Sequence, residues 1–206
     1  KGYLAMVQEG LYVKFSKEFT GVLQKIYLSN ERLIDLVNSL LDISRIEMGR
    51  MEFKFEGVQI ENIVESVLEE LSIQAKSKDL SLSFKKPKKP LPKIRVDKSK
   101  IRQVIMNLVD NGIRYTEKGG VAVRVKNLIT KIQIIVKDTG IGLTKREIED
   151  LFGMYARGKG KRMFPEGAGL GLYVANKLVQ SHLGKIWAES EGKDKGSTFY
   201  IELPIK

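Results

Sequence analysis

Apolar residues three and four positions apart indicate that the chain begins with helices. A short stripe of this kind breaks near Gly10, and Ser16 follows as a candidate N-cap of a longer helix, with Glu18 well placed for the helix dipole. Such spacing is typical of a bundle or coiled coil, so we expect the second stripe to pack against other helices. A core helix folded onto its own domain is the alternative. The second stripe consists of Ile26, Leu33, Val37 and Leu40, widened by Leu36, Leu41 and Ile43.

After residue 50 the pattern changes to a mixture of strands and helices. Because the two kinds of element do not alternate regularly, we expect an α+β fold, a two-layer sandwich with helices on one face of a sheet. The chain is therefore divided into two predicted domains, 1–50 and 51–206. Period-two alternation predicts strands over 51–58, 80–84, 121–125, 131–137, 185–190 and 198–203. Helical spacing and capping residues predict helices over 60–78, from Asp97 through Val109, and over 170–181.

Composition narrows the class of protein. Hydrophobic residues make up 42% and charged residues 30%, as in soluble globular proteins, and no apolar run reaches the roughly 20 residues needed to span a bilayer. The absence of cysteine excludes disulfides and thiolate metal sites and fits a reducing cytoplasm. The formal charge of +11 raises the question of nucleic acid. Its excess gathers in the lysine- and proline-rich stretch 85–93, which lacks interleaved aromatic residues for base stacking, so we expect no nucleic-acid partner.

Two asparagines four residues apart form the first candidate site. Asn107 and Asn111 project from one face of the predicted helix. An amide oxygen is a hard, neutral ligand that suits Mg²⁺. Arg114 follows, where a guanidinium can contact a phosphate through two hydrogen bonds, with Tyr115 beside it. Helical asparagines are more often surface or cap residues, so this pair gains meaning only together with other segments.

A single carboxylate follows an apolar predicted strand. Asp138 can accept a hydrogen bond from the exocyclic amine of adenine, whereas the carbonyl of guanine would leave both groups unpaired. Gly140 and Gly142 allow the backbone to turn sharply and to approach a base closely. A plain strand-ending turn is the alternative for this segment.

Two further glycine segments complete the set. Gly167-Ala-Gly-Leu-Gly-Leu172 opens a predicted helix, whose free amides and positive dipole end can receive phosphate. It matches neither a P-loop nor a dinucleotide fingerprint. Before it stands a predicted basic flap that can close over a polyphosphate, although a solvated loop would look similar. The cations of this flap are Arg157, Lys159, Lys161 and Arg162. The last segment is Gly196-Ser-Thr-Phe199.

With these segments in this order, the chain resembles a bacterial sensor histidine kinase of a two-component system over nearly its whole length. Residues 51–206 resemble the catalytic domain of the gyrase, heat-shock chaperone and histidine kinase ATP-binding superfamily, which has a Bergerat-type fold. Residues 29–47 resemble the second helix of the family's dimerisation and phosphoacceptor hairpin, so the resemblance makes 1–50 part of that hairpin. The family's N box corresponds to 107–116, its glycine boxes to 138–142, 167–172 and 196–199, and its F box to 152–157.

The resemblance implies roles for individual residues. Asn111 is expected to coordinate Mg²⁺, Asp138 to bind adenine and Arg157 to assist phosphoryl transfer. Where ATPases of the superfamily carry a glutamate that activates water, this chain has Asn107, which implies a kinase because water attack is slow without a general base. The residues expected to bind the nucleotide are Asn107, Asn111, Arg114, Tyr115, Asp138, Gly140, Gly142, Gly167, Gly169, Leu170, Gly171, Leu172 and Thr198.

The function implied is transfer of the γ-phosphate of ATP to a histidine and then to an aspartate of a response regulator. The family's acceptor histidine would precede Lys1, and His182, the only histidine here, stands where the family has a structural one. We therefore expect this chain to bind Mg-ATP without phosphorylating itself. The full-length protein is expected to form a homodimer through 1–50. Its kinase domain is expected to be cytoplasmic, and a membrane anchor upstream of Lys1 is compatible with this expectation.

Two alternatives stay open. One is a degenerate kinase that acts only as a dimerisation or binding module, which need not bind nucleotide. The other is an ATPase of the same superfamily, which Asn107 disfavours. The absence of both the His-Arg-Asp and the Asp-Phe-Gly motifs argues against a eukaryotic-type protein kinase.

Overall fold

The computed structural model describes residues 16–154 and 170–205, and the chain divides into two compact units, Lys1–Gly49 and Arg50–Lys206. In the first unit, helix α2 (Lys17–Glu47) begins where the sequence predicts, because the Ser16 hydroxyl accepts a hydrogen bond from the Phe19 N–H at 3.2 Å. The shorter stripe before Ser16 lies outside the described residues. None of the helices in the described ranges combines the length and hydrophobicity needed to span a membrane.

Most of the apolar stripe of α2 is exposed. Leu33 is 60% exposed and Val37 54%, and Ile26, Leu40 and Leu41 are also exposed. Leu36 is half-buried and Ile43 is buried. The packing of this stripe against other helices therefore stays a prediction.

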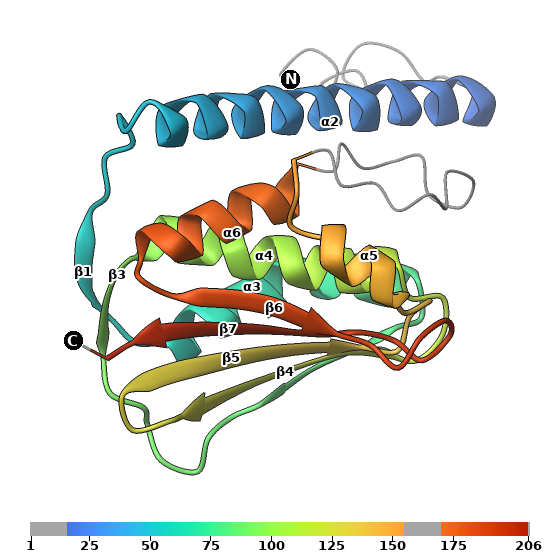
Figure 1. Ribbon diagram of the computed structural model, residues 1–206. Coiled ribbons are helices and arrows are strands. Elements are labelled where there is room, and N and C mark those ends of the chain that lie inside the picture. Colours follow the sequence, from blue (N-terminus) through green and yellow to red (C-terminus); the bar gives the residue numbers. More distant parts are fainter. Residues whose placement is uncertain (1–15, 155–169, 206) are drawn as a thin grey trace. The chain divides into compact units, whose positions relative to one another are not determined.

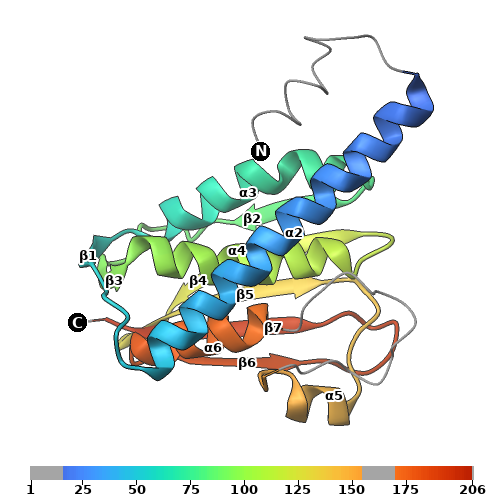
Figure 2. The same cartoon turned by 90° about the horizontal axis from the view of Figure 1, so that it is seen from above.

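The second unit contains a five-stranded sheet with three helices on one of its faces (Figure 1). Helix α4 lies between α3 and α6 and contacts both (Figure 2). This arrangement confirms the predicted α+β two-layer sandwich. In spatial order the strands are β2 (Ser81–Lys85), β4 (Gly120–Asn127), β5 (Lys131–Asp138), β7 (Thr198–Pro204) and β6 (Lys185–Glu189), with only the β2–β4 pair parallel. The three helices are α3 (Ile60–Ser77), α4 (Lys98–Arg114) and α6 (Gly171–Ser181).

The core between these layers consists of the apolar faces of the helices and of the sheet, as the sequence periodicity predicts. Asp97 caps α4 by accepting the backbone N–H groups of Ser99 and Lys100, and the apolar face of the helix then turns toward the sheet. Burying one aliphatic side chain of this size stabilises a fold by about 1.5–3 kcal/mol. Fully buried side chains of the core include Ile63, Ile101, Ile105, Leu108, Ile132, Ile134, Leu178, Ile201 and Leu203.

Two elements escaped the sequence analysis. Strand β3 (Ile94–Asp97) pairs antiparallel with β1 (Phe55–Val58), which is shorter than the predicted strand over 51–58. The four residues of β3 directly follow the proline-rich stretch 85–93, which indicated a loop, so the strand was not predicted. Helix α5 (Lys145–Asp150) begins with a capping box in which Thr144 and Glu147 bond each other's backbone N–H, and this Thr-x-x-Glu signature could have revealed it.

His182 is buried at the end of α6 and has the structural role that the sequence predicts. Its Nδ1 lies 2.7 Å from the Leu178 carbonyl oxygen, and its Nε2 accepts the backbone N–H of Asp97 at 3.0 Å. The ring is therefore neutral and protonated on Nδ1. Burial lowers its pKa, against the opposing effects of the Leu178 bond and the Asp97 charge. The bond to Asp97 connects the end of α6 to β3.

Candidate functional site

The carboxylate of Asp138 lies at the end of β5, only 5% exposed. Its Oδ1 accepts two backbone N–H bonds, from Gly140 at 2.8 Å and from Ser197 at 3.0 Å. Burial raises the pKa of Asp138, and these hydrogen bonds oppose that rise. No bond within the described residues uses Oδ2. This oxygen can therefore accept a hydrogen bond from an N–H group of a ligand.

The glycine segment after Asp138 is bonded to two other candidate segments. The Ile141 N–H donates to the carbonyl oxygen of Tyr115 at 3.2 Å, and the Gly196 N–H donates to that of Gly140 at 2.9 Å. A Cβ on Gly140 would overlap the Tyr115 carbonyl oxygen, so only glycine fits there. The end of α4, the segment 138–142 and the turn at Gly196 thus meet at one place, although they are far apart in sequence.

Within the last segment, the contact with the carboxylate comes from Ser197. Its backbone N–H reaches Asp138, whereas Thr198, the residue named from the sequence, begins β7 and pairs with Lys137 and Glu189. Ser197 was missed because a backbone donor does not depend on residue type. Its position directly before a predicted strand was the available signal.

A second residue that the sequence did not single out is Ser190. Its hydroxyl donates to the Gly196 carbonyl oxygen at 2.7 Å and accepts the Leu143 N–H at 2.9 Å. It therefore holds the segment after Gly142 against the last glycine turn. No local sequence signal distinguishes this serine from an ordinary loop residue.

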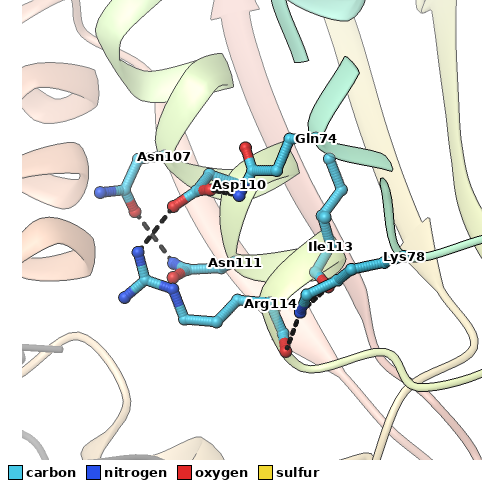
Figure 3. A network of polar contacts seen from close by, with 7 residues as sticks. All are labelled: Gln74, Lys78, Asn107, Asp110, Asn111, Ile113 and Arg114. Carbon is cyan, nitrogen blue, oxygen red and sulfur yellow. Dashed lines mark hydrogen bonds and ion pairs between the residues drawn. The ribbon is translucent and has the colours of Figure 1, made fainter. Parts of the chain in front are cut away.

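The two asparagines predicted from the sequence lie together on α4 (Figure 3). The Asn111 Nδ2 donates to the Asn107 Oδ1 at 3.1 Å, so the amide oxygen of Asn111 is the atom that can bind a cation. A Cβ on Gly171, the first residue of α6, would overlap the Asn107 amide nitrogen. The beginning of α6 therefore lies directly against the amide pair.

The amide pair and Asp138 belong to one region of the fold. A Cβ on Gly112, the residue after Asn111, would lie 3.6 Å from the Cβ of Asp138 and 2.9 Å from a methyl group of Val121. Among the described residues no group of three or more His, Cys, Asp or Glu side chains could hold a metal ion. A cation beside Asn111 would thus need ligand oxygens as well, as Mg²⁺ does when it is bound with phosphates.

The remaining predicted residues are distributed as follows. Arg114, on the last turn of α4, forms an ion pair with Asp110, with Nη2 2.9 Å from Oδ2 (Figure 3). Tyr115 is the C-cap of the same helix. Leu170 is the buried N-cap of α6, and Leu172 is half-buried in its first turn. Arg157, Gly167 and Gly169 lie outside the described residues.

Comparison with known proteins shows the family of the chain. The sequence profile of the family described as "Histidine kinase-, DNA gyrase B-, and HSP90-like ATPase" matches residues 96–206, which is more than half of the chain and includes every candidate site residue. The chain belongs to this family. Membership confirms the resemblance drawn from the glycine and asparagine segments, and it supports ATP as the nucleotide.

Relatives and solved structures agree with this assignment. The adaptive-response sensory kinase SasA of Synechococcus sp. (strain JA-3-3Ab) is 34% identical, over 84% of this chain and 46% of that protein. The sensor histidine kinase WalK of Bacillus subtilis (strain 168) is 32% identical, over 100% of this chain and 34% of that protein. Full-length ShkA, solved in complex with AMPPNP, superposes with a TM-score of 0.80 at 26% identity, over 98% of this chain and 42% of that one. The chain thus spans less than half the length of these relatives.

Proposed function

We propose that this chain is the ATP-binding catalytic region of a sensor histidine kinase. In the complete system the γ-phosphate of ATP would pass to a histidine of a dimerisation hairpin and then to an aspartate in a response-regulator receiver domain. The observation that carries the proposal is the position of the Asp138 carboxylate. It accepts backbone N–H groups from two glycine segments and lies in the same region as the amide pair of α4. The kinase names of the relatives SasA and WalK support it.

The adenine ring would lie against the Asp138 end of the site. Because Oδ1 already accepts two backbone N–H bonds, Oδ2 would accept the exocyclic amine of adenine. Guanine presents a carbonyl oxygen at that position, and two acceptors would then face each other. A buried acceptor without a partner is unfavourable, so this contact would select adenine. Gly140 and Gly142 would let the backbone approach the ring.

The triphosphate would lie toward α4 and the beginning of α6. Asn111 would hold Mg²⁺ through its amide oxygen, and the bound ion would neutralise phosphate charge. Arg114 and the first amides of α6 would contact phosphate oxygens, because a helix N-terminus favours anions. We assign Arg157, outside the described residues, an assisting role in transfer. The protein's part in such a reaction is positioning and electrostatic stabilisation.

Transfer to a histidine is favoured over hydrolysis by the side chain at position 107. An amide cannot take a proton from water as a glutamate can, and the oxygen of Asn107 is already bonded to Asn111. The acceptor is not His182, which is 4% exposed and has both ring nitrogens engaged. We therefore assign acceptance of the phosphate to another histidine, in the cytoplasm where ATP and the regulator are present.

Dimerisation is assigned to the exposed apolar stripe of α2. Its spacing of three and four residues is that of helices that pack along their length, and a second copy of the chain supplies an identical stripe. A stripe of this length is unfavourable in water. The exposed members of the stripe are Ile26, Leu33, Val37, Leu40 and Leu41, and Phe19 and Val22 are further exposed apolar residues of the same helix.

Replacing Asp138 by asparagine tests the proposed site. In Asp138→Asn the remaining oxygen can keep both backbone bonds, while the new amide N–H₂ would face the adenine amine. We expect the affinity for the ATP analogue AMPPNP, measured by calorimetry with Mg²⁺, to fall at least about 100-fold. Because burial raises the pKa of Asp138, its charged form is disfavoured in the fold, so loss of the charge should not lower the melting temperature.

The matched control is Asp79→Asn. Asp79 is exposed, and its backbone φ of 55° is one that asparagine tolerates. The replacement removes the same charge from a residue that is not among the proposed nucleotide contacts. This variant should bind AMPPNP like the wild type. The unmodified chain given γ-labelled ATP is expected to retain no stable label. Undiminished AMPPNP binding by Asp138→Asn would disprove the adenine assignment.

A further inference from the structure

Two side chains of the α3 region hold the last turn of α4, the turn that carries Arg114 (Figure 3). Gln74 and Lys78 are four residues apart and so point the same way. Lys78 Nζ donates to the carbonyl oxygens of Ile113 at 3.1 Å and of Arg114 at 3.2 Å. These are among the carbonyl groups that a helix end leaves without intrahelical partners, and an ammonium group there also complements the helix dipole. The backbone of this turn is thereby fixed.

Gln74 acts on the side chains of the same turn through Asp110. Its Nε2 donates to the Asp110 Oδ1 at 2.9 Å, while the Asp110 Oδ2 accepts from Arg114 Nη2 at 2.9 Å. Each carboxylate oxygen thus receives a bond from a different helix. An ion pair between two mobile side chains contributes little, because both must be ordered. Here Gln74 has already ordered the carboxylate.

We propose that Asp110, held by Gln74, is a positioning residue for Arg114 in nucleotide binding. This inference rests on the proposed function, in which Arg114 contacts the phosphates. The guanidinium has five N–H donors in a rigid plane, so the bond from Nη2 to Asp110 orients the whole plane. Arg114 lies one turn after Asp110 and three residues after Asn111, on the part of α4 that is bonded to the Asp138 segment through Tyr115.

The sign of the effect separates positioning from simple charge. A carboxylate near a triphosphate repels it, so neutralising Asp110 would by field alone tighten binding of the anion. Positioning predicts the reverse: without the carboxylate the guanidinium loses its fixed orientation, and the phosphates bind more weakly. A purely structural role predicts a third result, in which phosphate-free ligands lose affinity equally.

The test compares AMPPNP with adenosine, which lacks phosphate, on Asp110→Asn, Gln74→Ala and Asp110→Glu. We expect Asp110→Asn to weaken AMPPNP about three- to fivefold and to leave adenosine unchanged, the range set by a partly exposed charge pair. Gln74→Ala removes one hydrogen bond to the carboxylate and leaves the ion pair with Arg114 in place, so it should weaken AMPPNP binding less, about twofold. Asp110→Glu restores the charge and should lie between Asp110→Asn and the wild type.

The matched control is Glu70→Gln. Glu70 forms an ion pair with Arg102, which joins the same two helices about two turns before Asp110. This variant should bind both ligands like the wild type. Equal loss of AMPPNP binding in Glu70→Gln, equal loss of adenosine in Asp110→Asn, or AMPPNP affinity that is unchanged or higher in Asp110→Asn each overturns the inference. Should Asp110→Asn fail to fold, unchanged AMPPNP affinity in Gln74→Ala overturns it. If the wild type binds neither ligand, the proposed function fails too.

Discussion

Helices α2 and α4 carry the same kind of apolar spacing, yet their apolar faces meet opposite environments. On α4, Ile101, Ile105 and Leu108 are completely buried, whereas on α2 residues such as Leu33 and Val37 are more than half exposed. Periodicity shows that a helix has an apolar face and says nothing about what covers it. For α4 the covering surface is the sheet of its own unit. For α2 we propose a second copy of the chain.

This difference in burial is the reason that α4 can carry part of the candidate site. The buried stripe of α4 fixes the helix against the sheet, so the amide pair and Arg114 of the same helix occupy definite positions relative to Asp138. A helix such as α2, whose stripe is exposed in the single chain, gives no such frame. We therefore assign assembly, and no part of the binding site, to α2.

The largest expected difference is in the free energy of unfolding. Leu108→Ala truncates a fully buried side chain of α4 and should lower the free energy of unfolding by about 2–5 kcal/mol. The same truncation in α2, Leu33→Ala, should change it by no more than about 0.5 kcal/mol when the chain is monomeric. Urea denaturation at low protein concentration measures both. Equal losses would show that the two faces do not differ as described.

A smaller effect is expected when the stripe of α2 receives a charge. Leu33→Lys would place an ammonium group in the proposed interface and should weaken self-association at least about tenfold. Binding of AMPPNP should be unchanged, because the candidate site lies in the other unit. Sedimentation over a range of concentrations gives the dissociation constant of the dimer.

The control for this change is Asn38→Lys, which adds the same charge at an exposed polar position beside Val37. It should leave self-association intact. A wild-type chain that stays monomeric at every concentration would contradict the assignment of dimerisation to α2 alone. So would a Leu33→Lys variant that dimerises as the wild type does.

The smallest expected effect concerns pH, because the buried side chains of the second unit include the titratable His182. Burial lowers the pKa of His182 below its ordinary value of 6.5. Just below pH 6.5 the histidine is therefore protonated in the unfolded chain and still neutral in the folded chain. Its contribution is therefore fully present above pH 6.5 and is lost as the pH falls toward the folded pKa. His182→Gln should therefore reduce the drop in unfolding free energy between pH 7 and pH 5.

Urea denaturation of both proteins at the two pH values measures this difference. Glutamine can still bond the Asp97 N–H and the Leu178 carbonyl, so the fold should persist. Identical pH dependence in the two proteins would mean that His182 is not the group responsible. Helix α2 contains no histidine, so the effect of this substitution belongs to the second unit.

Local signals were enough to predict most elements, the fold class and the family. Ser16 and Asp97 cap their helices as their residue types predict, because capping depends on neighbours within three residues. Strand alternation predicted β5 and β7 for a similar reason. The same local signals missed β3, which is short and follows prolines, and α5, whose capping box was present but not used.

Contacts between distant segments could be established only from the folded chain. That the N–H bonded to Asp138 comes from Ser197, that Ser190 holds the glycine turn and that Gln74 reaches Asp110 are all consequences of packing. Every non-proline residue offers a backbone N–H, so its use leaves no mark in composition or periodicity. Short polar side chains are equally common in loops that bind nothing. Their roles arise when the sheet and helices bring segments far apart in the chain within hydrogen-bonding distance.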